Sequence, residues 1–232
     1  MIFIIKVNKY FMGNIDRIIR NNIRSFINEE VYYHGTVTQN ADGIHRNGLN
    51  PSMKQTNVGG GNDEFASGEG LSYLTKNKGN AYRYSLMGND SDEYSHVFEC
   101  NSDDIKNQKC DEDEIGSLIY NYYIGKIKEL PFNRGLLKLL TPNELNLIKQ
   151  GNFKGYTACK KILNQMTQND IRRTLSIVNN MTTPDNVRHR KHYRVKRPSS
   201  EEYQEMMNYQ KYGNRIMDNL AQYYDKNKEE VY

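Results

Sequence analysis

The chain has 232 residues, of which 37% are hydrophobic and 26% are charged, so it can bury one ordinary core and carry a small helical extension. The net charge of +4 does not by itself indicate a partner, and no stretch approaches the roughly 18 consecutive apolar residues of a membrane helix. Three cysteines, at spacings typical of neither a zinc site nor a disulfide framework, indicate a reducing, intracellular compartment. That compartment would be the host cytosol if the chain is an effector or a viral protein.

The segment 1–30 consists of an N-terminal stretch, 1–12, to which we assign no function, and an amphipathic helix. Residues 1–5 are apolar but too few for a secretory signal, and 1–12 have little pattern. Asn14 is placed to cap an amphipathic helix that would pack beneath the first strand. One face of this helix carries Ile15, Ile18, Ile19, Ile23 and Phe26.

Three short motifs between 31 and 85 dominate the chain. V-Y-Y-H-G-T at 31–36 predicts a strand that ends near His34, and Gly35 would let another molecule approach the backbone closely. L-S-Y-L-T at 71–75 predicts a second short strand. N-A-Y-R-Y-S at 80–85 follows a turn and predicts a helix. A histidine, a strand tyrosine (Tyr73) and a helix tyrosine (Tyr84) therefore recur in order.

These motifs resemble the ADP-ribosyltransferases with a His-Tyr-Glu signature, the family of the diphtheria toxin and poly(ADP-ribose) polymerase catalytic domains. The stretch 41–51 is similar to the family's helix and the Gly-apolar step after it, and 59–64 is similar to its glycine-rich acidic loop. Tyr73 and Tyr84 match its two stacking tyrosines, eleven positions apart. The resemblance covers the stretch 31–85 and implies NAD+ as co-substrate.

The resemblance also implies roles for individual residues. His34 would hydrogen-bond a ribose hydroxyl, and the main chain of Gly35 would pair with the nicotinamide amide. Tyr73 and Tyr84 would grip the nicotinamide ring, each contributing roughly 1 kcal/mol or somewhat more. The other residues expected to contact NAD+ are Tyr33, Thr36, Gly48 and Thr75. Breaking the nicotinamide–ribose bond leaves an oxocarbenium-like sugar, so the site also needs a fixed carboxylate.

Glu202 is our candidate for that carboxylate. Ser199-Ser200-Glu201-Glu202-Tyr203 is similar to the Ser-rich approach and the Glu-Tyr pair of the family, although the family's Glu lies on a strand. The alternative is a capping box, because Glu202 comes three residues after Ser199 at the start of a helix. Glu201 is its neighbour, and the pair Glu112 and Glu114 is the reserve. Glu114 follows Tyr84 closely in the chain, which leaves little room for the strands between them.

Helices are predicted between the early and the late strands. His96 to Cys100 reads as a strand that returns to the sheet. Asp111 and Glu114 have capping-box spacing, and acids in a first helical turn complement the helix dipole. Thr141, Pro142 and Glu144 mark another helix start. We expect a helical insertion over 111–181.

The stretch from Arg188 to Arg197 carries six cationic residues and no acidic one. It predicts either a contact for the phosphates of a dinucleotide or nucleic acid, or an edge strand protected by charge. His189 and His192 have H-x-x-H spacing, but cationic neighbours oppose a metal, so we expect none. His45 is expected at the surface.

The fold expected from the resemblance is α+β, with a split pair of antiparallel sheets around an NAD+ cleft. The ADP-ribosyltransferase-like domain would span 31–200, with a C-terminal helix over 201–232. The expected activity transfers ADP-ribose to a protein or nucleic-acid acceptor and releases nicotinamide. Two alternatives stay open: an enzyme like the RNA 2′-phosphotransferases, which also consume NAD+, and a non-catalytic module that binds NAD+, ADP-ribose or nucleic acid. No membrane contact is expected.

Overall fold

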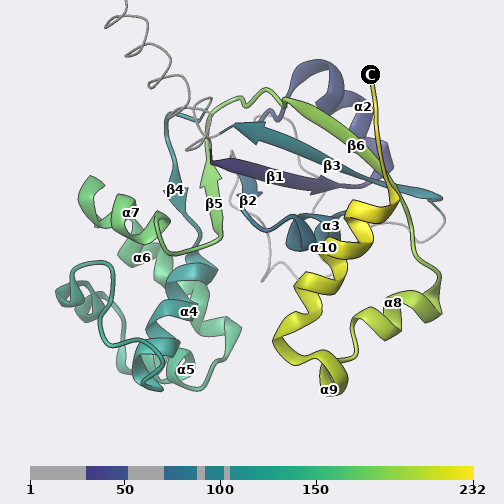
Figure 1. Cartoon of the computed structure of the whole chain (residues 1–232). Helices are drawn as coiled ribbons and strands as arrows, with labels where there is room; N and C mark the ends of the chain where they lie inside the picture. The colour runs from purple at the N-terminus through teal and green to yellow at the C-terminus, as the bar shows by residue number, and fades with distance from the viewer. Residues whose placement is uncertain (1–29, 52–70, 88–91, 102–104) are drawn as a thin grey trace, which may run out of the picture.

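The computed structural model describes residues 30–51, 71–87, 92–101 and 105–232. Within these residues the fold is α+β, and seven strands form one antiparallel sheet in the order β4-β5-β2-β1-β3-β6-β7 (Figure 1). The strands are β1 (Val31–Thr36), β2 (Ser72–Thr75), β3 (Tyr94–Asn101), β4 (Lys109–Cys110), β5 (Asn180–Thr183), β6 (Lys191–Lys196) and β7 (Lys228–Glu230).

The junction between β1 and β2 divides this sheet into two halves. The pairing of β1 with β2 rests on one residue pair, Tyr33 with Thr75, whereas six pairs join β1 to β3 and four join β2 to β5. Figure 1 shows β1, β3 and β6 crossing the molecule at a steep angle to β2, β4 and β5. A single sheet with a weak joint therefore stands where the resemblance implies two sheets.

The described helices fall into an N-terminal pair, an inserted group and a C-terminal group. The first two groups are α2 (Thr38–Asn47), α3 (Lys78–Leu86), α4 (Glu112–Tyr123), α5 (Pro142–Lys149), α6 (Lys160–Leu163) and α7 (Gln168–Leu175), with 3-10 turns η3 (Arg134–Leu139) and η4 (Phe153–Cys159). The C-terminal group is α8 (Ser200–Met206), α9 (Tyr209–Tyr212), η5 (Gly213–Arg215) and α10 (Ile216–Asn227). The segment between β4 and β5 is helical.

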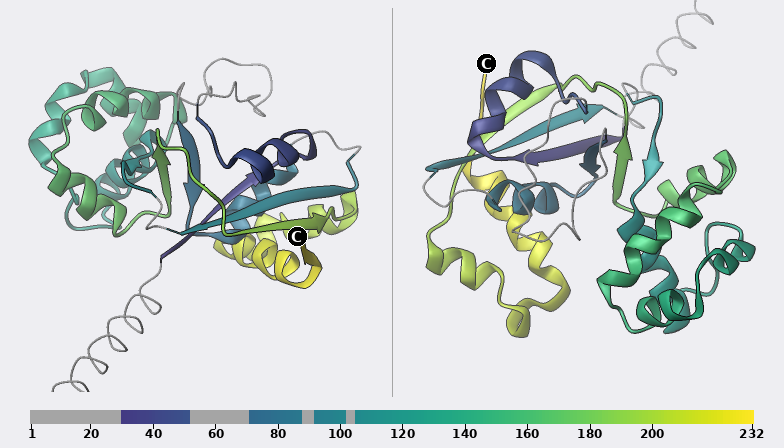
Figure 2. Two further views of the ribbon diagram at one scale, coloured as in Figure 1. Left: turned by 90° about the horizontal axis from the view of Figure 1, so that it is seen from above. Right: turned by 180° about the vertical axis from the view of Figure 1, so that it is seen from behind.

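Helices cover both faces of the half formed by β1, β3 and β6 (Figure 2). On one face α3 and α10 pack against Val97 and Val195, and Ala81 and Leu220 are completely buried there. On the other face α2 brings His45 against His192. Both faces of the half that contains β1 are therefore covered by helices.

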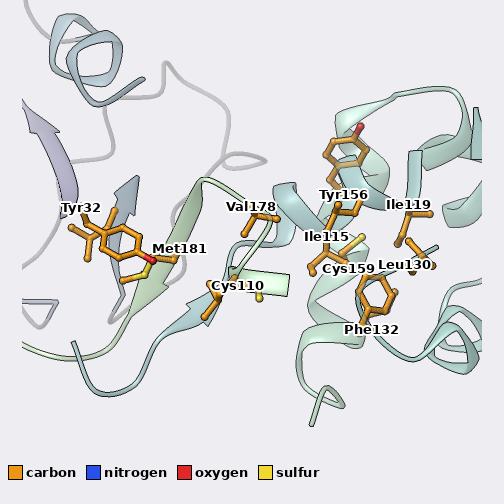
Figure 3. Packing of buried hydrophobic residues seen from close by; sticks show 14 of the residues in the cluster. Tyr32, Cys110, Ile115, Ile119, Leu130, Phe132, Tyr156, Cys159, Val178 and Met181 are labelled. Atoms are coloured by element: carbon orange, nitrogen blue, oxygen red, sulfur yellow. The ribbon is translucent and has the colours of Figure 1, made fainter. Parts of the chain in front are cut away.

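A second apolar core lies beneath the inserted helices (Figure 3). It runs from Tyr32 and Met181 on the sheet through Cys110 to Ile115 and Cys159 on the helices. The cysteines at 100, 110 and 159 are all buried and free. This continuous core fixes the start of α4 relative to β2 and β5.

Two of the predicted helix starts are confirmed as capping boxes. At α5 the Thr141 side chain accepts the N–H of Glu144 while the Glu144 carboxylate accepts the N–H of Thr141. The same reciprocal pair joins Ser199 and Glu202 at α8. A Ser or Thr followed three residues later by Glu is a sufficient signal in both places.

The single long C-terminal helix expected from the sequence is wrong. The chain bends twice between α8 and α10, and Gly213 has a φ of +51°, a conformation that a helix cannot continue through. After α10 the chain adds β7 to β6, with Arg194 opposite Glu229. The basic strand β6 is therefore an inner strand, and the edge-strand interpretation is also wrong.

The predicted helix over 14–26, the segment 1–12 and the glycine-rich loop at 59–64 lie outside the described residues. Within the described part of the chain, no helix is both long enough and apolar enough to cross a membrane.

Candidate functional site

His34 and Tyr73 meet at the junction of the two sheet halves. The Nδ1 atom of His34 lies 2.8 Å from the backbone oxygen of Tyr73. Burial lowers the pKa of His34, and the hydrogen bond to Tyr73 only partly opposes this. A carbonyl oxygen can only accept, so Nδ1 carries the proton of the neutral ring and Nε2 keeps a lone pair. That atom can accept a hydrogen bond from a ligand hydroxyl.

Tyr84 is the exposed aromatic residue of α3, a helix whose other face is buried. Asn77 caps this helix by accepting the N–H of Asn80 at 3.1 Å. Asn80 and Tyr84 are one turn apart and share a face, while Tyr82 and Ser85 are buried on another. The Tyr84 side chain is 49% exposed. Its ring is a surface on which a flat ligand can stack.

Gly35 is required by the packing of α3. A Cβ built at Gly35 would lie 1.7 Å from the backbone oxygen of Ala81, so the helix touches the strand at this residue. The space that a side chain at Gly35 would occupy is thus filled by the main chain of α3. The sequence predicts that another molecule approaches Gly35 closely, whereas on this side the close neighbour is a helix of the same chain. This contact fixes Tyr84 relative to His34.

The four other residues expected to contact NAD+ have contacts within the fold. The hydroxyl of Thr75 accepts the N–H of Asn77, and Thr36 is buried on β1. Gly48 ends α2 with a φ of +76°, and a Cβ there would lie 2.8 Å from the Val187 oxygen. Tyr33 is half-buried and packs against the core beneath α3 and α10. Their contacts with NAD+ stay predictions.

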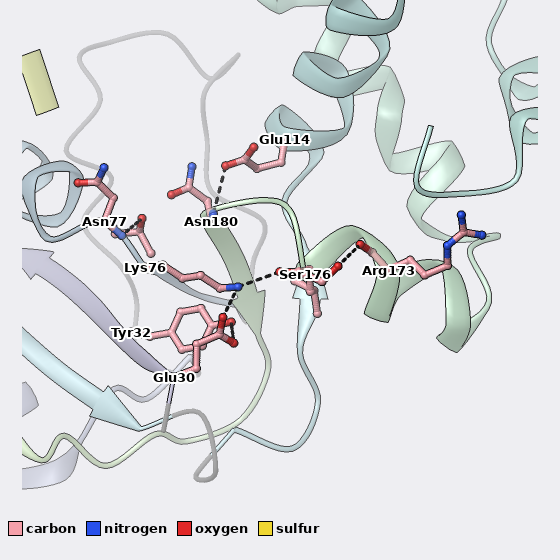
Figure 4. Close-up of polar contacts among 10 residues, drawn as sticks. Glu30, Tyr32, Lys76, Asn77, Glu114, Arg173, Ser176 and Asn180 are labelled. Carbon is pink, nitrogen blue, oxygen red and sulfur yellow. Dashed lines mark hydrogen bonds and ion pairs between the residues drawn. The ribbon is translucent and has the colours of Figure 1, made fainter. Parts of the chain in front are cut away.

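Glu114 contacts the first residue of β5, which pairs with the last residue of β2 (Figure 4). Its Oε1 atom accepts the N–H of Asn180 at 3.1 Å, and Asn180 pairs with Thr75 across the two strands. The Asn80 side chain donates to the Asn180 side chain at 3.1 Å. Glu114 is thus fixed beside the exposed face of α3. No sequence signal marks Asn80 or Asn180, because short polar residues at element ends are common.

The carboxylates at the start of α4 are crowded. Asp111 caps the helix by accepting the N–H of Asp113, and its side chain is buried. Burial and the charges of Asp113 and Glu112 raise the pKa of Asp111 to about 7. The predicted capping box between Asp111 and Glu114 is not formed, because Asp111 accepts from Asp113 and the Glu114 carboxylate bonds Asn180. Burial also raises the pKa of Glu114.

Tyr84 lies close enough to this group to respond to its charge. The pKa of Tyr84 is raised first by burial and then by Asp111, while Arg83 opposes the shift and Asp113 and Glu114 add to it. The acids of α4 therefore act on the pKa of Tyr84 in one direction, and Arg83 acts in the other.

Glu202 lies elsewhere. Its carboxylate closes the capping box of Ser199, and this bonding lowers the pKa of Glu202. Glu201 is exposed in the same turn. Figures 1 and 2 show α8 and the inserted helices on opposite sides of α10. The structure joins His34 to Tyr73 by a hydrogen bond and Glu114 to Asn180, the residue that pairs with Thr75 at the end of β2, whereas the Glu202 carboxylate is engaged at Ser199.

A cavity of about 510 Å³ opens beside Glu114. It lies between α4, the end of α5, η4 and the first residue of β5, with Asp113, Tyr120 and Gln150 among its lining residues.

The basic stretch predicted to contact phosphates is partly neutralised by β7. Arg194 pairs with Glu229 at 2.7 Å, and Lys191 pairs with Glu230 at 3.6 Å. Arg197 donates to the backbone oxygen of Leu86. The phosphate contact of this stretch stays a prediction. Two of its six cationic side chains, Lys191 and Arg194, are paired with acids of β7.

Four histidines gather on the face of the sheet beneath α2. His192 lies 2.9 Å from His96 through Nε2 and 3.1 Å from His45 through Nδ1, and His189 packs near by. His45 is half-buried, so the surface position expected for it is wrong. Burial and the neighbouring histidines lower the pKa of His192 to about 4.

The contacts among these histidines differ from those of a metal site. The central ring, His192, uses different nitrogen atoms toward its two partners, so the three rings cannot all meet one ion. Across the described residues, no group of three or more His, Cys, Asp or Glu side chains is arranged to hold a metal.

Comparison of the chain with protein-family models, with curated proteins and with solved structures finds no match.

Proposed function

We propose that the protein is an NAD+-dependent ADP-ribosyltransferase, which transfers ADP-ribose to a macromolecular acceptor and releases nicotinamide. The observation that carries the proposal is the hydrogen bond between His34 Nδ1 and the Tyr73 backbone oxygen at 2.8 Å. His34 and Tyr73, which are 39 positions apart, meet at the junction of β1 and β2, and Tyr84 lies on the helix that touches β1 at Gly35. This arrangement supports the proposal.

The proposed binding mode places nicotinamide between Tyr73 and Tyr84. Two aromatic faces suit a cationic pyridinium, which gains both stacking and cation–π attraction. The Nε2 atom of His34 accepts a hydrogen bond from a hydroxyl of the adenosine or nicotinamide ribose. Gly35 follows His34 and lies two residues after Tyr33, the residue of β1 that pairs with β2. By resemblance, its main chain hydrogen-bonds the nicotinamide amide.

We propose Glu114 as the carboxylate that stabilises the oxocarbenium-like ribose. Its carboxylate accepts the N–H of Asn180, whose side chain accepts from Asn80 on α3, so the charge is held in one position and is preorganised for this purpose. Glu202, the candidate from the sequence, has its carboxylate engaged at the Ser199 cap on the other side of α10. Such a group typically contributes about 2.7–4 kcal/mol to the transition state.

Calorimetry with NAD+ and the full chain tests this binding mode. Tyr84→Ala should weaken NAD+ binding about five- to tenfold, because one stacked ring is lost. Tyr209→Ala is the matched control, since Tyr209 is 70% exposed on α9, away from the site. Absence of NAD+ binding to the unaltered chain, or equal losses in both variants, contradicts the proposal.

Product analysis separates the two alternatives. A cyclic ADP-ribose phosphate formed from a 2′-phosphorylated RNA indicates the phosphotransferase reaction. NAD+ binding without any nicotinamide release indicates a non-catalytic module. The ion pairs between β6 and β7 give the RNA alternative less support than the sequence does.

A further inference from the structure

The cavity beside Glu114 is bounded by two kinds of side chain. Asp113 and Glu114 form its acidic wall at the start of α4, and Tyr120 and Tyr156 supply aromatic rings. Packing holds both rings in place: a Cβ at Gly116 would lie 2.3 Å from Tyr156, and one at Gly151 would lie 3.4 Å from Tyr120. Its volume of about 510 Å³ is within the range of small-ligand sites.

The charge of the cavity excludes the dinucleotide phosphates as its occupant. None of the described residues that line it is a lysine or an arginine, and the acidic wall would repel a pyrophosphate. Its amides at Asn121 and Gln150 can accept hydrogen bonds from a donor-rich group. The cavity therefore suits a second, cationic substrate.

A guanidinium matches these walls better than an ammonium. It is planar, stacks on aromatic rings, and presents several donors in a fork that fits carboxylates and amide oxygens. The crowded carboxylates at 111–114 have one described ion pair to a lysine, Glu112 with Lys160 at 3.3 Å. A bound cation would relieve their mutual repulsion.

We propose that this cavity binds the guanidinium of an arginine side chain, which is the acceptor of ADP-ribose. The proposal rests on the proposed function, because it names the second substrate of the same site. The Glu114 carboxylate lies at the boundary between the cavity and the face of α3 that carries Tyr84. The acceptor nitrogen would thus approach the ribose from the α4 side.

The transfer step balances without another reactant. A guanidino nitrogen forms a bond to C1′ of the ribose while the bond from C1′ to the nicotinamide nitrogen breaks. The electron pair of the broken bond neutralises the pyridinium, so nicotinamide leaves uncharged. The proton lost by the attacking nitrogen passes to the Glu114 carboxylate and from there to water.

Agmatine, a small guanidinium compound, tests the proposal with the full chain. Calorimetry should detect agmatine binding to the unaltered protein, and mass spectrometry should detect ADP-ribosyl-agmatine when NAD+ is present. Asp113→Asn should raise the KM for agmatine at least tenfold. Asp113 is exposed, so this change does not disturb the core. Glu129→Gln is the matched control: it removes the same charge at an exposed residue outside the cavity lining and outside the carboxylates at 111–114, and should change the KM less than twofold.

The outcomes separate this proposal from the proposed function. Nicotinamide release without any agmatine adduct, or equal effects of the two variants, overturns the acceptor proposal and leaves the transferase proposal standing. Adducts on lysine, carboxylate or nucleic-acid acceptors in place of agmatine also overturn it. Agmatine binding without nicotinamide release supports the guanidinium site and contradicts the transferase.

Discussion

Gly35 on β1 and Ala81 on α3 are in direct backbone contact, because a Cβ at Gly35 would lie 1.7 Å from the Ala81 oxygen. This contact sets the distance between the strand that carries His34 and the helix that carries Tyr84. Gly35→Ala should therefore push the helix away and lower the free energy of unfolding by about 2 to 3 kcal/mol.

Gly43→Ala is the control for this prediction. Nothing lies within 4 Å of a Cβ at Gly43, and the residue is inside α2, so alanine should raise stability by about 0.5 to 1 kcal/mol. Chemical denaturation of both variants measures the difference. If the two changes have similar effects, the close packing of β1 and α3 is not as described.

Asp111→Asn should stabilise the protein at pH 8. The folded pKa of Asp111 is about 7, above the 3.8 that is usual for an aspartate, so its charged form is disfavoured by folding. Stability from this group is lost as the pH rises from about 4 to 7, and asparagine, which also caps helices, escapes that loss. The gain should be on the order of 1 to 3 kcal/mol at pH 8 and small near pH 4.

Asp170→Asn should do the opposite and serves as the matched control. Asp170 is also buried at a helix start, but its bonds to Thr167 and Asn133 lower its pKa. Its charge stabilises the fold above about pH 4, so the substitution should cost about 1 to 2 kcal/mol at pH 7. Unfolding curves at several pH values check both signs. A loss of stability in Asp111→Asn at pH 8 contradicts the assigned crowding of carboxylates.

His192 should make the fold sensitive to acid. Its pKa is lowered to about 4, mainly by burial, and its side chain is 4% exposed. The unfolded chain binds this proton near pH 6.5, so stability falls as the pH drops from about 6.5 to 4, by roughly 2 to 3 kcal/mol. Asp111 has the opposite effect, because its raised pKa increases stability as the pH falls from about 7 to 4. Comparing the unaltered chain with His192→Gln therefore isolates the contribution of His192.

The titratable groups around His192 are His45 on α2, His96 on β3, His189 and the acid Asp42. The difference in stability between the unaltered chain and His192→Gln should shrink steadily below about pH 6.5. Parallel pH profiles for the two proteins would rule out the lowered pKa.

The local features of the candidate site are predictable from the sequence, whereas the contact of Glu114 with the start of β5 is not. The strand at 31–36, the second strand and the helix of Tyr84 follow from short motifs with strong turn and capping residues. The sequence favours Glu202 because the interval between Tyr84 and Glu114 is short. That interval does hold both β3 and β4, since β4 is only Lys109–Cys110.

Long-range contacts account for the rest. The bond from Glu114 to Asn180 joins residues 66 positions apart, and nothing in either local sequence indicates it. The histidine cluster escapes prediction for the same reason, because the partners of the H-x-x-H pair come from α2 and β3. Capping patterns, by contrast, involve residues three apart and are identified directly at Thr141 and Ser199.

Single Gln substitutions compare the two candidate acids. Glu114→Gln should lower the rate of nicotinamide release by about two to three decades with little change in NAD+ affinity, because the charge acts in the transition state. Glu202→Gln should retain near-full turnover and lose about 1 kcal/mol of stability at the cap of α8. The reverse pattern of turnover would assign the role to Glu202.

The most direct test of the central claim is the release of nicotinamide from NAD+ by the full chain, followed by chromatography. We predict release by the unaltered protein, a rate at least tenfold lower in Tyr73→Ala and in Tyr84→Ala, and an unchanged rate in Tyr209→Ala. The absence of release by the unaltered protein with NAD+ and every acceptor tested, or full rates in both tyrosine variants of the site, would contradict the account.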